Sequence, residues 1–326
     1  MTEPGSPLPV PDIARMGEDI LAEVGTAVVG MDEPLRTALA TICAGGHVLF
    51  EDVPGLGKTL AARSLAGALG LEFGRLQCTP DLLPADITGS YVYDPAGRTF
   101  EFRRGALFTG LFLADEINRT APKTQSALLE AMAEGQVTVE GTSFQLPQPF
   151  HVLATSNPVE YEGTYPLPEA QLDRFMVRLS VGYPGTEGEV DVLDRRIARR
   201  TEKPTITQVT SAETVRAMQA GVEQVEVHPD VLHYCVALAG ATRSHSAVEV
   251  GASPRGSLAL VLLARARAVL AGRAFLTPED VKQIAVPALA HRLVLNPAAW
   301  ATGTSPEAVV EELLTEVPTP ATSTAG

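Results

Sequence analysis

The sequence predicts an α/β fold with a parallel sheet, followed by a small all-α domain. Between residues 45 and 182, short apolar runs alternate with segments of helical periodicity, which is typical of strands buried on both faces of a parallel sheet. From about residue 186 onward, the segments show only the helical period. A chain of 326 residues has room for about two such domains.

The strands expected in the first domain are His47–Glu51, Phe73–Cys78, Leu111–Asp115, His151–Thr155 and Phe175–Val181. Between the first two strands lies LAARSLAGALG, whose apolar residues 61, 62, 65, 66 and 69 follow the 3.6-residue period. Gly70 stands where this helix should end. A strand, loop, helix and strand in this order indicate a βαβ unit, so the first domain is α/β.

The second domain is expected to be helical, with helices over 187–200, 211–223, 229–241, 255–271 and 277–293. Thr277 and Pro278 form a good helix start, because threonine caps the N-terminus and proline suits the first turn. We therefore divide the chain into a flexible, proline-rich arm (1–11), an α/β core (12–185), a linker (186–205), a helical lid domain (206–317) and a disordered tail (318–326).

The segment DVPGLGKT, Asp52 to Thr59, predicts a phosphate-binding P-loop (Walker A). Small residues allow backbone N–H groups to curl around phosphate oxygens, lysine reaches the β- and γ-phosphates, and the following hydroxyl suits Mg²⁺. The strict pattern has glycine where this chain has Asp52, but the expected strand and helix flank the loop correctly. The nucleotide-binding residues expected here are Asp52, Val53, Pro54, Gly55, Leu56, Gly57, Lys58, Thr59 and Leu60.

The segment LFLADE, Leu111 to Glu116, predicts a second phosphate-site motif, a Walker B strand. Asp115 would bind Mg²⁺ together with Thr59, and Glu116 would orient and polarise the attacking water. Two adjacent acids usually belong to a solvated loop, but these follow a strongly apolar strand downstream of a P-loop. An NKxD-type guanine-reading motif is absent from the sequence, so we expect ATP and Mg²⁺ as cofactors.

Composition limits the classes of partner and the cellular location that we expect. The formal net charge of −14 disfavours non-specific binding to nucleic acid or anionic lipid. Three scattered cysteines, Cys43, Cys78 and Cys235, form no disulfide framework and are expected to be buried. The N-terminus has no signal-peptide pattern, and no apolar stretch is suited to membrane insertion. We therefore expect a cytoplasmic protein.

From about residue 10 to residue 315, the chain resembles a known family, the MoxR family of AAA+ ATPases. The resemblance rests on EDVPGLGKT (51–59), LLPADITGSYVYDPA (82–96), ADEINRTAPKTQSALLEAMAEGQVTVEG (114–141), ATSNPVEYEGTYPLPEAQLDRF (154–175) and GASPRG (251–256). An aspartate at position 52 is usual in such sequences. The resemblance implies an AAA+ core with β-hairpin inserts and a helical lid.

The resemblance also implies residue roles. Asn157 looks like sensor 1, which positions the water, although asparagine before proline is also a common turn former. Arg174 looks like an arginine finger for the neighbouring subunit's ATP, and Arg255 looks like sensor 2, reaching the γ-phosphate from the lid. Each arginine could instead be a surface residue near a helix end. Val29 and Gly30 resemble the adenine-contacting turn, and Arg119 an interface residue.

Two inserts are expected as β-hairpins. Residues 84–104 would interrupt the second helix of the core, and residues 135–150 alternate β-branched and polar residues. Such hairpins face the pore or the partner in related rings, or are simply decorated loops.

The function implied by the resemblance is ATP hydrolysis at subunit interfaces of an oligomeric, hexameric ring, coupled to chaperone-like maturation or assembly of protein complexes. The resemblance alone implies von Willebrand factor A-domain partners. A nucleic-acid motor or loader is the first alternative; Arg98, Arg103 and Arg104 in the first insert favour it, whereas 135–150 lacks Lys and Arg. The second alternative is a nucleotide-gated scaffold with little turnover.

Overall fold

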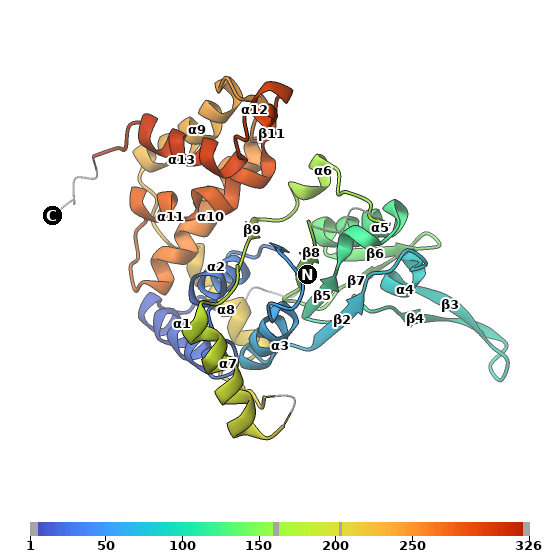
Figure 1. The fold of residues 1–326 in the computed structure, drawn as a ribbon. Coiled ribbons are helices and arrows are strands. Elements are labelled where there is room, and N and C mark those ends of the chain that lie inside the picture. The colour runs from blue at the N-terminus through green and yellow to red at the C-terminus, as the bar shows by residue number, and fades with distance from the viewer. Residues whose placement is uncertain (1–5, 159–162, 202–203, 322–326) are drawn as a thin grey trace.

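The computed structural model of the chain describes residues 6–158, 163–201 and 204–321. It has an α/β part, from which two β-hairpins project, and a helical part beside it (Figure 1). The expected fold class, a parallel-sheet core with hairpin inserts and a helical lid, is confirmed.

The core is a five-stranded parallel sheet with the order β2-β5-β8-β1-β9. Its strands are β1 (Val48–Glu51), β2 (Phe73–Gln77), β5 (Leu111–Asp115), β8 (His151–Ser156) and β9 (Val177–Leu179). Because all strands run in one direction, their carboxyl ends meet at one edge of the sheet, where ligands bind in open α/β sheets. β9 is shorter than expected, and β2 is wrongly predicted as doubly buried, since it is an edge strand with Arg75 and Gln77 exposed.

Alternate residues of the strands face two apolar clusters. Val48 and Phe50 pack towards α1 (Val10–Gly25), α2 (Asp32–Cys43) and α3 (Lys58–Leu69), whereas Leu49 joins the other cluster with α5 (Pro122–Glu134). The sheet is therefore a middle layer between helices, as the apolar strand runs predict. All three cysteines are buried, as expected.

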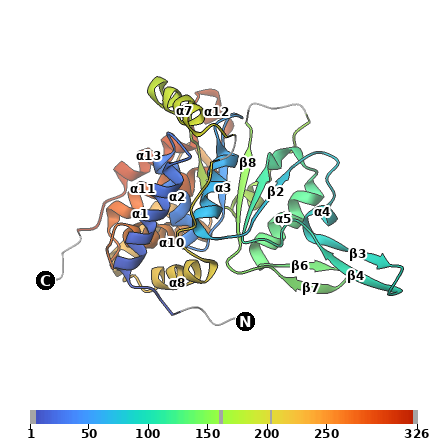
Figure 2. The same cartoon turned by 90° about the horizontal axis from the view of Figure 1, so that it is seen from below.

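Both hairpin inserts are present and extend to one side of the sheet (Figure 2). The first is formed by β3 (Gly89–Asp94) and β4 (Thr99–Arg104), and the second by β6 (Gln136–Val139) and β7 (Thr142–Gln145). The expected span 84–104 was partly wrong, because its first residues form the short helix α4 (Pro84–Thr88). The hairpin follows α4 and leads to β5 without a second helical half, so it does not interrupt a helix.

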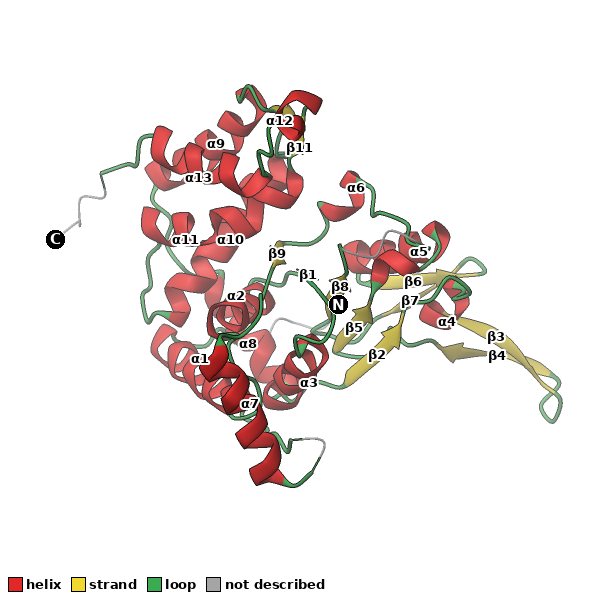
Figure 3. Cartoon of the chain, viewed as in Figure 1, coloured by secondary structure: helices red, strands yellow, loops and turns green. Residues whose placement is uncertain are grey.

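The C-terminal part is mostly helical (Figure 3). Its elements are α8 (Ala212–Val222), α9 (Pro229–Ser244), α10 (Pro254–Leu270), α11 (Pro278–Leu289), α12 (Pro297–Ala301), α13 (Pro306–Glu316) and a small sheet of β10 (Val248–Val250) and β11 (Val294–Leu295). Short elements elsewhere are η1 (Ile117–Arg119), α6 (Glu169–Leu172) and η2 (Ala290–Arg292). Helix α10 packs against α1 and α2 as well as against α9 and α11, so one apolar cluster joins lid and core.

Two expected boundaries change. The linker 186–205 contains the helix α7 (Thr186–Arg199), which the helical pattern over 187–200 predicts. The arm is shorter than 1–11, because α1 begins at Val10 and the backbone N–H of Leu8 donates to the carbonyl of Ala217. Residues 1–5, and 322–326 of the expected tail, lie outside the described residues. Within the described part, no helix combines the length and apolarity needed to cross a membrane.

Candidate active site

The P-loop connects the end of β1 to the start of α3, as its pattern predicts. Gly55 has φ 86° and Gly57, the N-cap of α3, has φ 81°. These left-handed conformations cost little for glycine and would strain most other residues, which explains glycine at both positions. The loop therefore presents its backbone beside the N-terminus of a 12-residue helix, an arrangement suited to anions.

Lys58 lies inside this loop. Its Nζ donates to the carbonyls of Asp52 and Val53 at 2.7 and 3.1 Å, and only 8% of the residue is exposed. Burial lowers the pKa of Lys58 from its ordinary value, and the nearby carboxylates of Asp52, Asp115 and Glu116 partly oppose this effect. The ammonium group is therefore held within the loop.

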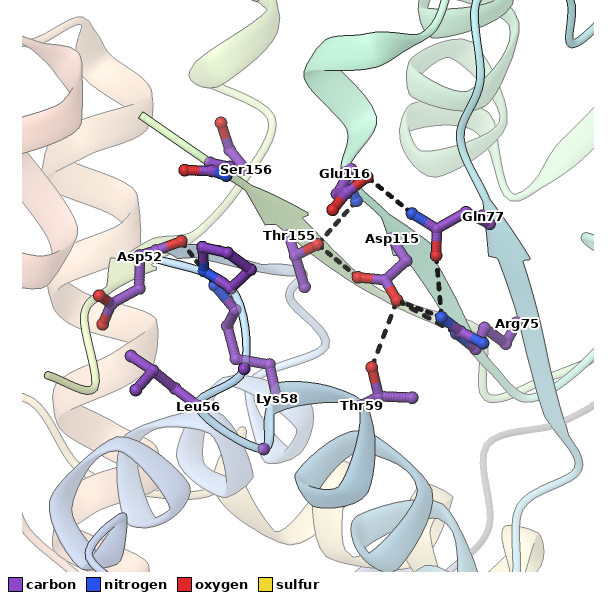
Figure 4. A pocket seen from close by; sticks show the side chains of 14 residues that line it. Asp52, Leu56, Lys58, Thr59, Arg75, Gln77, Asp115, Glu116, Thr155 and Ser156 are labelled. Atoms are coloured by element: carbon purple, nitrogen blue, oxygen red, sulfur yellow. Dashed lines mark hydrogen bonds and ion pairs between the residues drawn. The ribbon is translucent and has the colours of Figure 1, made fainter. Parts of the chain in front are cut away.

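Asp52 points its carboxylate towards the segment after β9 (Figure 4). One oxygen accepts hydrogen bonds from the backbone N–H groups of Val181 and Gly182, both at 2.7 Å, and from the hydroxyl of Ser180 at 3.0 Å. Partial burial alone would raise the pKa of Asp52, but these bonds and one from the Val53 N–H outweigh it and lower the pKa. The side chain thus joins the P-loop to the chain leading into α7.

Two acidic residues at the carboxyl end of β5 are fixed by one hydroxyl (Figure 4). Thr155, on β8, donates from Oγ1 to Asp115 Oδ1 at 2.7 Å and accepts from the backbone N–H of Glu116 at 2.7 Å. The other oxygen of Asp115 accepts from Thr59 Oγ1 at 3.3 Å. The neighbouring strands thereby hold the acids in front of the P-loop.

Glu116 adopts a left-handed backbone conformation, with φ 58°. Such a conformation is unfavourable for a residue with a side chain and tends to occur at functional sites. The carboxylate accepts a hydrogen bond from Gln77 at 2.8 Å and forms an ion pair with Arg119 at 3.1 Å. Arg119, expected at an interface, therefore lies next to Glu116 in this chain.

The site residues Arg75, Gln77 and Thr155 were not predicted from the sequence. Arg75 forms an ion pair with Asp115 at 2.7 Å and donates to Gln77 at 2.8 Å. Polar residues at alternate positions of β2 were the available signal, because residues i and i+2 share one face of a strand. The parallel register places Gln77 beside Asp115.

The loop and the acids surround a cavity of about 240 Å³. Most expected nucleotide-site residues line it, together with Arg75, Gln77, Thr155 and Ser156, which were not predicted. The lining consists of Asp52, Pro54, Gly55, Leu56, Gly57, Lys58, Thr59, Arg75, Gln77, Asp115, Glu116, Thr155, Ser156 and Asn157. The described lining does not include Val53, Leu60, Val29 or Gly30. Gly30 instead lies against Pro184, since a Cβ at Gly30 would be 3.4 Å from that of Pro184.

Asn157 follows β8 and is buried at the wall of this cavity. Its backbone carbonyl accepts a hydrogen bond from Asn118 at 3.1 Å. The structure thus places Asn157 in one cavity with Lys58 and Glu116, as the sensor 1 expectation requires.

Arg174 and Arg255 lie together in a different hollow of about 370 Å³. This hollow is lined by Gly45, Gly46, His47, Met132, Ala133, Asp173, Arg174, Met176, Arg255, Leu258, Ala259, Leu262 and Arg292. Arg255 therefore lies outside the P-loop cavity of its own chain. The reason is that α10 packs on α1 and α2, which places its N-terminus beside the segment before β9.

Asp173 holds the two arginine-bearing segments together. Its carboxylate forms an ion pair with the buried Arg292 at 2.7 Å and accepts from Ser253, the N-cap of α10, at 3.0 Å. Asp173 precedes Arg174, and Ser253 lies two residues before Arg255. The hydrogen bonds of Asp173 therefore hold the segments that carry both arginines next to each other.

The residues of the P-loop cavity fit Mg²⁺ and a nucleotide by the chemistry of their donors. Thr59 and Asp115 offer hard hydroxyl and carboxylate oxygens, which Mg²⁺ prefers. Lys58 and the backbone of Gly55 to Gly57 offer the cation and amide donors that phosphates require. Among the residues that the structure describes, no group of three or more His, Cys, Asp or Glu side chains could hold another metal ion.

Comparisons with known proteins agree with this geometry. Residues 47–177 match the model of the ATPase family associated with various cellular activities (AAA), and residues 240–313 match that of the AAA lid domain. The chain is 46% identical to the uncharacterized protein YeaC of Bacillus subtilis, over 91% of this chain and 92% of that protein. It is 40% identical to Chaperone MoxR1 of Mycobacterium tuberculosis, over 93% and 82%.

A crystal structure from Cytophaga hutchinsonii, provisionally assigned as an ATPase, superposes with a TM-score of 0.89 at 39% identity, covering 95% of this chain and 97% of that one. Family models, relatives and fold thus agree with the P-loop and the paired acids of β5. The chain belongs to the MoxR family of AAA+ ATPases.

Proposed function

We propose that this protein hydrolyses ATP with Mg²⁺ at sites shared between subunits of an oligomeric, hexameric ring, and couples hydrolysis to chaperone-like remodelling, maturation or assembly of protein complexes. The observation that carries the proposal is the division of the site. The phosphate, metal and water residues share one cavity, whereas Arg174 and Arg255 share another hollow.

The residues of the P-loop cavity have distinct chemical tasks. Lys58 and the P-loop amides would bind the phosphates, and Thr59 and Asp115 would hold Mg²⁺. Mg²⁺, when bound, supplies charge neutralisation at the phosphates. Glu116 would accept a proton from the attacking water, which Asn157 would orient.

We infer that the cavity receives further cations from a neighbouring subunit. Lys58 and Arg75 are the cations among its described lining residues, and Arg75 is already paired with Asp115 at 2.7 Å. An arginine supplied by a neighbour accelerates phosphoryl transfer in related NTPases by about 10³–10⁵-fold. Arg174 and Arg255, presented together, supply such charge if the two faces meet in a ring.

Protein clients are favoured over nucleic acid. A relative of this chain is named Chaperone MoxR1, and we extend a chaperone role to this protein. The net charge of −14 and a second hairpin without Lys or Arg give little attraction for a phosphate backbone. Partners with a von Willebrand factor A-type domain and a cytoplasmic location remain part of the proposal.

The direct test is ATP hydrolysis as a function of protein concentration, with and without Mg²⁺. We expect specific activity to rise with concentration, to require Mg²⁺, and to be nearly abolished by Glu116→Gln, which leaves nucleotide binding intact. Glu134→Gln, at the exposed end of α5, is the matched control and should behave as the parent.

Constant specific activity over all concentrations would contradict the shared site. Hydrolysis stimulated by DNA and falling steeply with salt would instead favour a nucleic-acid motor. Tight binding of ATP with negligible turnover in an assembled ring would favour a nucleotide-gated scaffold.

A further inference from the structure

Helix α7 turns three apolar residues to solvent, while its ion pair Asp191–Arg195 lies against the protein. None of its 14 residues is buried. Val190, Leu193 and Ile197 are 47%, 61% and 72% exposed. On the opposite side, Arg195 is half-buried and donates to the carbonyl of Gly25 at the end of α1.

The exposed apolar residues form one stripe. Positions 190, 193 and 197 have the i, i+3, i+7 spacing that places residues on one helix face. Asp191 and Arg195, paired at 2.7 Å, lie on the face towards α1. Surface helices normally bury their apolar stripe, so an outward stripe marks an interaction surface. Figures 1 and 2 both show α7 at the periphery of the molecule.

We propose that the outward stripe of α7, formed by Val190, Leu193 and Ile197, binds a second copy of this chain at the subunit boundary. The inference rests on the shared site proposed above and identifies the surface that closes it. The first argument is position. α7 begins at Thr186, four residues after Gly182, whose N–H is bonded to Asp52 of the P-loop. The stripe therefore lies on the P-loop side of the boundary.

The second argument is a complementary apolar surface beside the arginines. Leu258, on α10, is 56% exposed and lines the hollow with Leu262 and Met132. It lies one helical turn after Arg255, on the same side of α10. When Arg174 and Arg255 approach a neighbour's P-loop, Leu258 approaches the chain that leads into the neighbour's α7.

Charge is the third argument. The first half of α7 carries Glu187, Glu189, Asp191 and Asp194, of which Asp191 is paired within the helix. The hollow carries Arg174, Arg255 and Arg292 against the single acid Asp173. The second half of α7 carries Arg195, Arg196 and Arg199, so only its first half is acidic. In the hollow, Arg292 is buried and paired with Asp173, which leaves Arg174 and Arg255 as the cations opposite this acidic half. This complementarity favours a second copy over an anionic membrane or an acidic partner.

The first test is Ile197→Glu, with Ala198→Glu as the matched control one position away on an exposed part of α7. We expect Ile197→Glu to raise the protein concentration needed for assembly and for half-maximal specific ATPase activity by about tenfold or more, because a charge replaces a buried apolar contact. Activity should return at high concentration, and Ala198→Glu should match the parent. Sedimentation velocity and ATPase titration measure both effects.

Cross-linking tests the contact directly. Ile197→Cys and Leu258→Cys are prepared as separate, differently tagged proteins, mixed, and treated with a short bismaleimide. The native cysteines are buried, so they should react slowly. We expect a cross-linked pair that carries both tags and requires both new cysteines. Leu232→Cys, exposed on α9 outside the hollow, replaces Leu258→Cys in the control and should cross-link far less.

The outcomes separate this inference from the proposed function. If assembly and concentration-dependent hydrolysis are present but Ile197→Glu leaves them unchanged, the α7 contact is wrong and the shared site stands. If Ile197→Glu abolishes only a client-dependent effect, or only the co-flotation of the protein with phosphatidylglycerol vesicles, the stripe binds a client or a membrane. Either result would overturn the inference. If the parent shows no concentration dependence at any ionic strength, the shared site itself is wrong.

Discussion

At the scale of single residues, Thr155 determines how Asp115 and Glu116 face the P-loop. Its hydroxyl donates to one acid and accepts from the backbone of the other, both at 2.7 Å. Thr155→Val keeps the shape of the side chain and removes both bonds. We expect kcat for ATP hydrolysis to fall about 10- to 100-fold, because catalysis depends on groups held in place.

Two measurements make this prediction specific. Nucleotide affinity, measured with a fluorescent ATP analogue, should change little, because Lys58 and the P-loop backbone are untouched. Thr155→Ser keeps the hydroxyl and should retain most of the activity. Equal loss in the serine and valine variants would show that packing of the methyl group, rather than the two hydrogen bonds, matters.

A second residue-scale prediction concerns buried histidines. Burial lowers the pKa of His47 and of His151 to about 4, and lowers that of His291 well below its usual value. These histidines are neutral in the folded protein, whereas in the unfolded chain they take up protons near pH 6.5. Their stabilising contribution is therefore complete above pH 6.5 and is lost as pH falls from 6.5 towards 4.

Urea unfolding at a series of pH values measures this effect. We expect the free energy of unfolding to decrease below pH 6.5, with on the order of 3 kcal/mol from His151 by pH 4. His151→Gln should make the decrease shallower, and His233→Gln, at an exposed position, should leave it unchanged. An identical pH slope in the parent and in His151→Gln would refute the assignment.

The sequence predicted the residues of the loop and of β5, because their chemistry is tied to a local pattern. Lys58, Thr59, Asp115 and Glu116 all follow from contiguous motifs and lie in one cavity. Arg75, Gln77 and Thr155 did not follow, since their contacts depend on which strands are neighbours. The order β2-β5-β8 is a long-range property that brings residues from three separate segments together.

At the scale of elements, Asp173 joins the segment before β9 to the start of α10. Its partner Arg292 has only 3% of its side chain exposed. Asp173→Asn leaves that guanidinium buried without a carboxylate, which costs about 3–5 kcal/mol in comparable buried pairs. We therefore expect a clear loss in the free energy of unfolding, measured by urea titration, and weaker ATPase activity in the assembled protein.

An exposed ion pair provides the control for Asp173. Arg265 and Glu223 lie 2.9 Å apart with the glutamate 59% exposed, so Glu223→Gln should change the stability by less than about 1 kcal/mol. Ser253→Ala removes the hydrogen bond to Asp173 and the N-cap bond from the Arg255 N–H, and should cost about 1–3 kcal/mol. Similar stabilities for Asp173→Asn and Glu223→Gln would contradict the role of Asp173 in joining the segment before β9 to α10.

Periodicity predicted whether a segment is a helix or a strand better than it predicted what that segment packs against. The period identified α7 to α11 and the hairpins, but it did not identify α12 and α13. It also did not identify β2 as an edge strand or α4 at the start of the first insert. The stretch Pro84–Thr88 forms only five helical residues, too few for a periodic signal. α7 was predicted as a helix, yet its orientation on the protein is a tertiary property.

At the scale of the whole molecule, the position of α10 decides how the site is completed. Packing of α10 on α1 and α2 places Arg255 beside Arg174 and away from the P-loop of the same chain. The expectation that Arg255 reaches a γ-phosphate came from the family resemblance, which carries no information on domain packing. In one chain the two arginines are separated from the P-loop cavity, and the ring proposed above would bring the two faces together.

The central claim is that one active site needs residues of two subunits, and a mixing experiment tests it most directly. Glu116→Gln lacks the water-activating acid, and Arg174→Ala lacks the arginine supplied to the neighbour, so each variant alone should be nearly inactive. An equimolar mixture contains interfaces that pair an intact Glu116 with an intact Arg174, and we expect it to recover part of the parent's ATP hydrolysis. No recovery from a mixture shown to form mixed assemblies, or full activity of Arg174→Ala alone, would contradict the account.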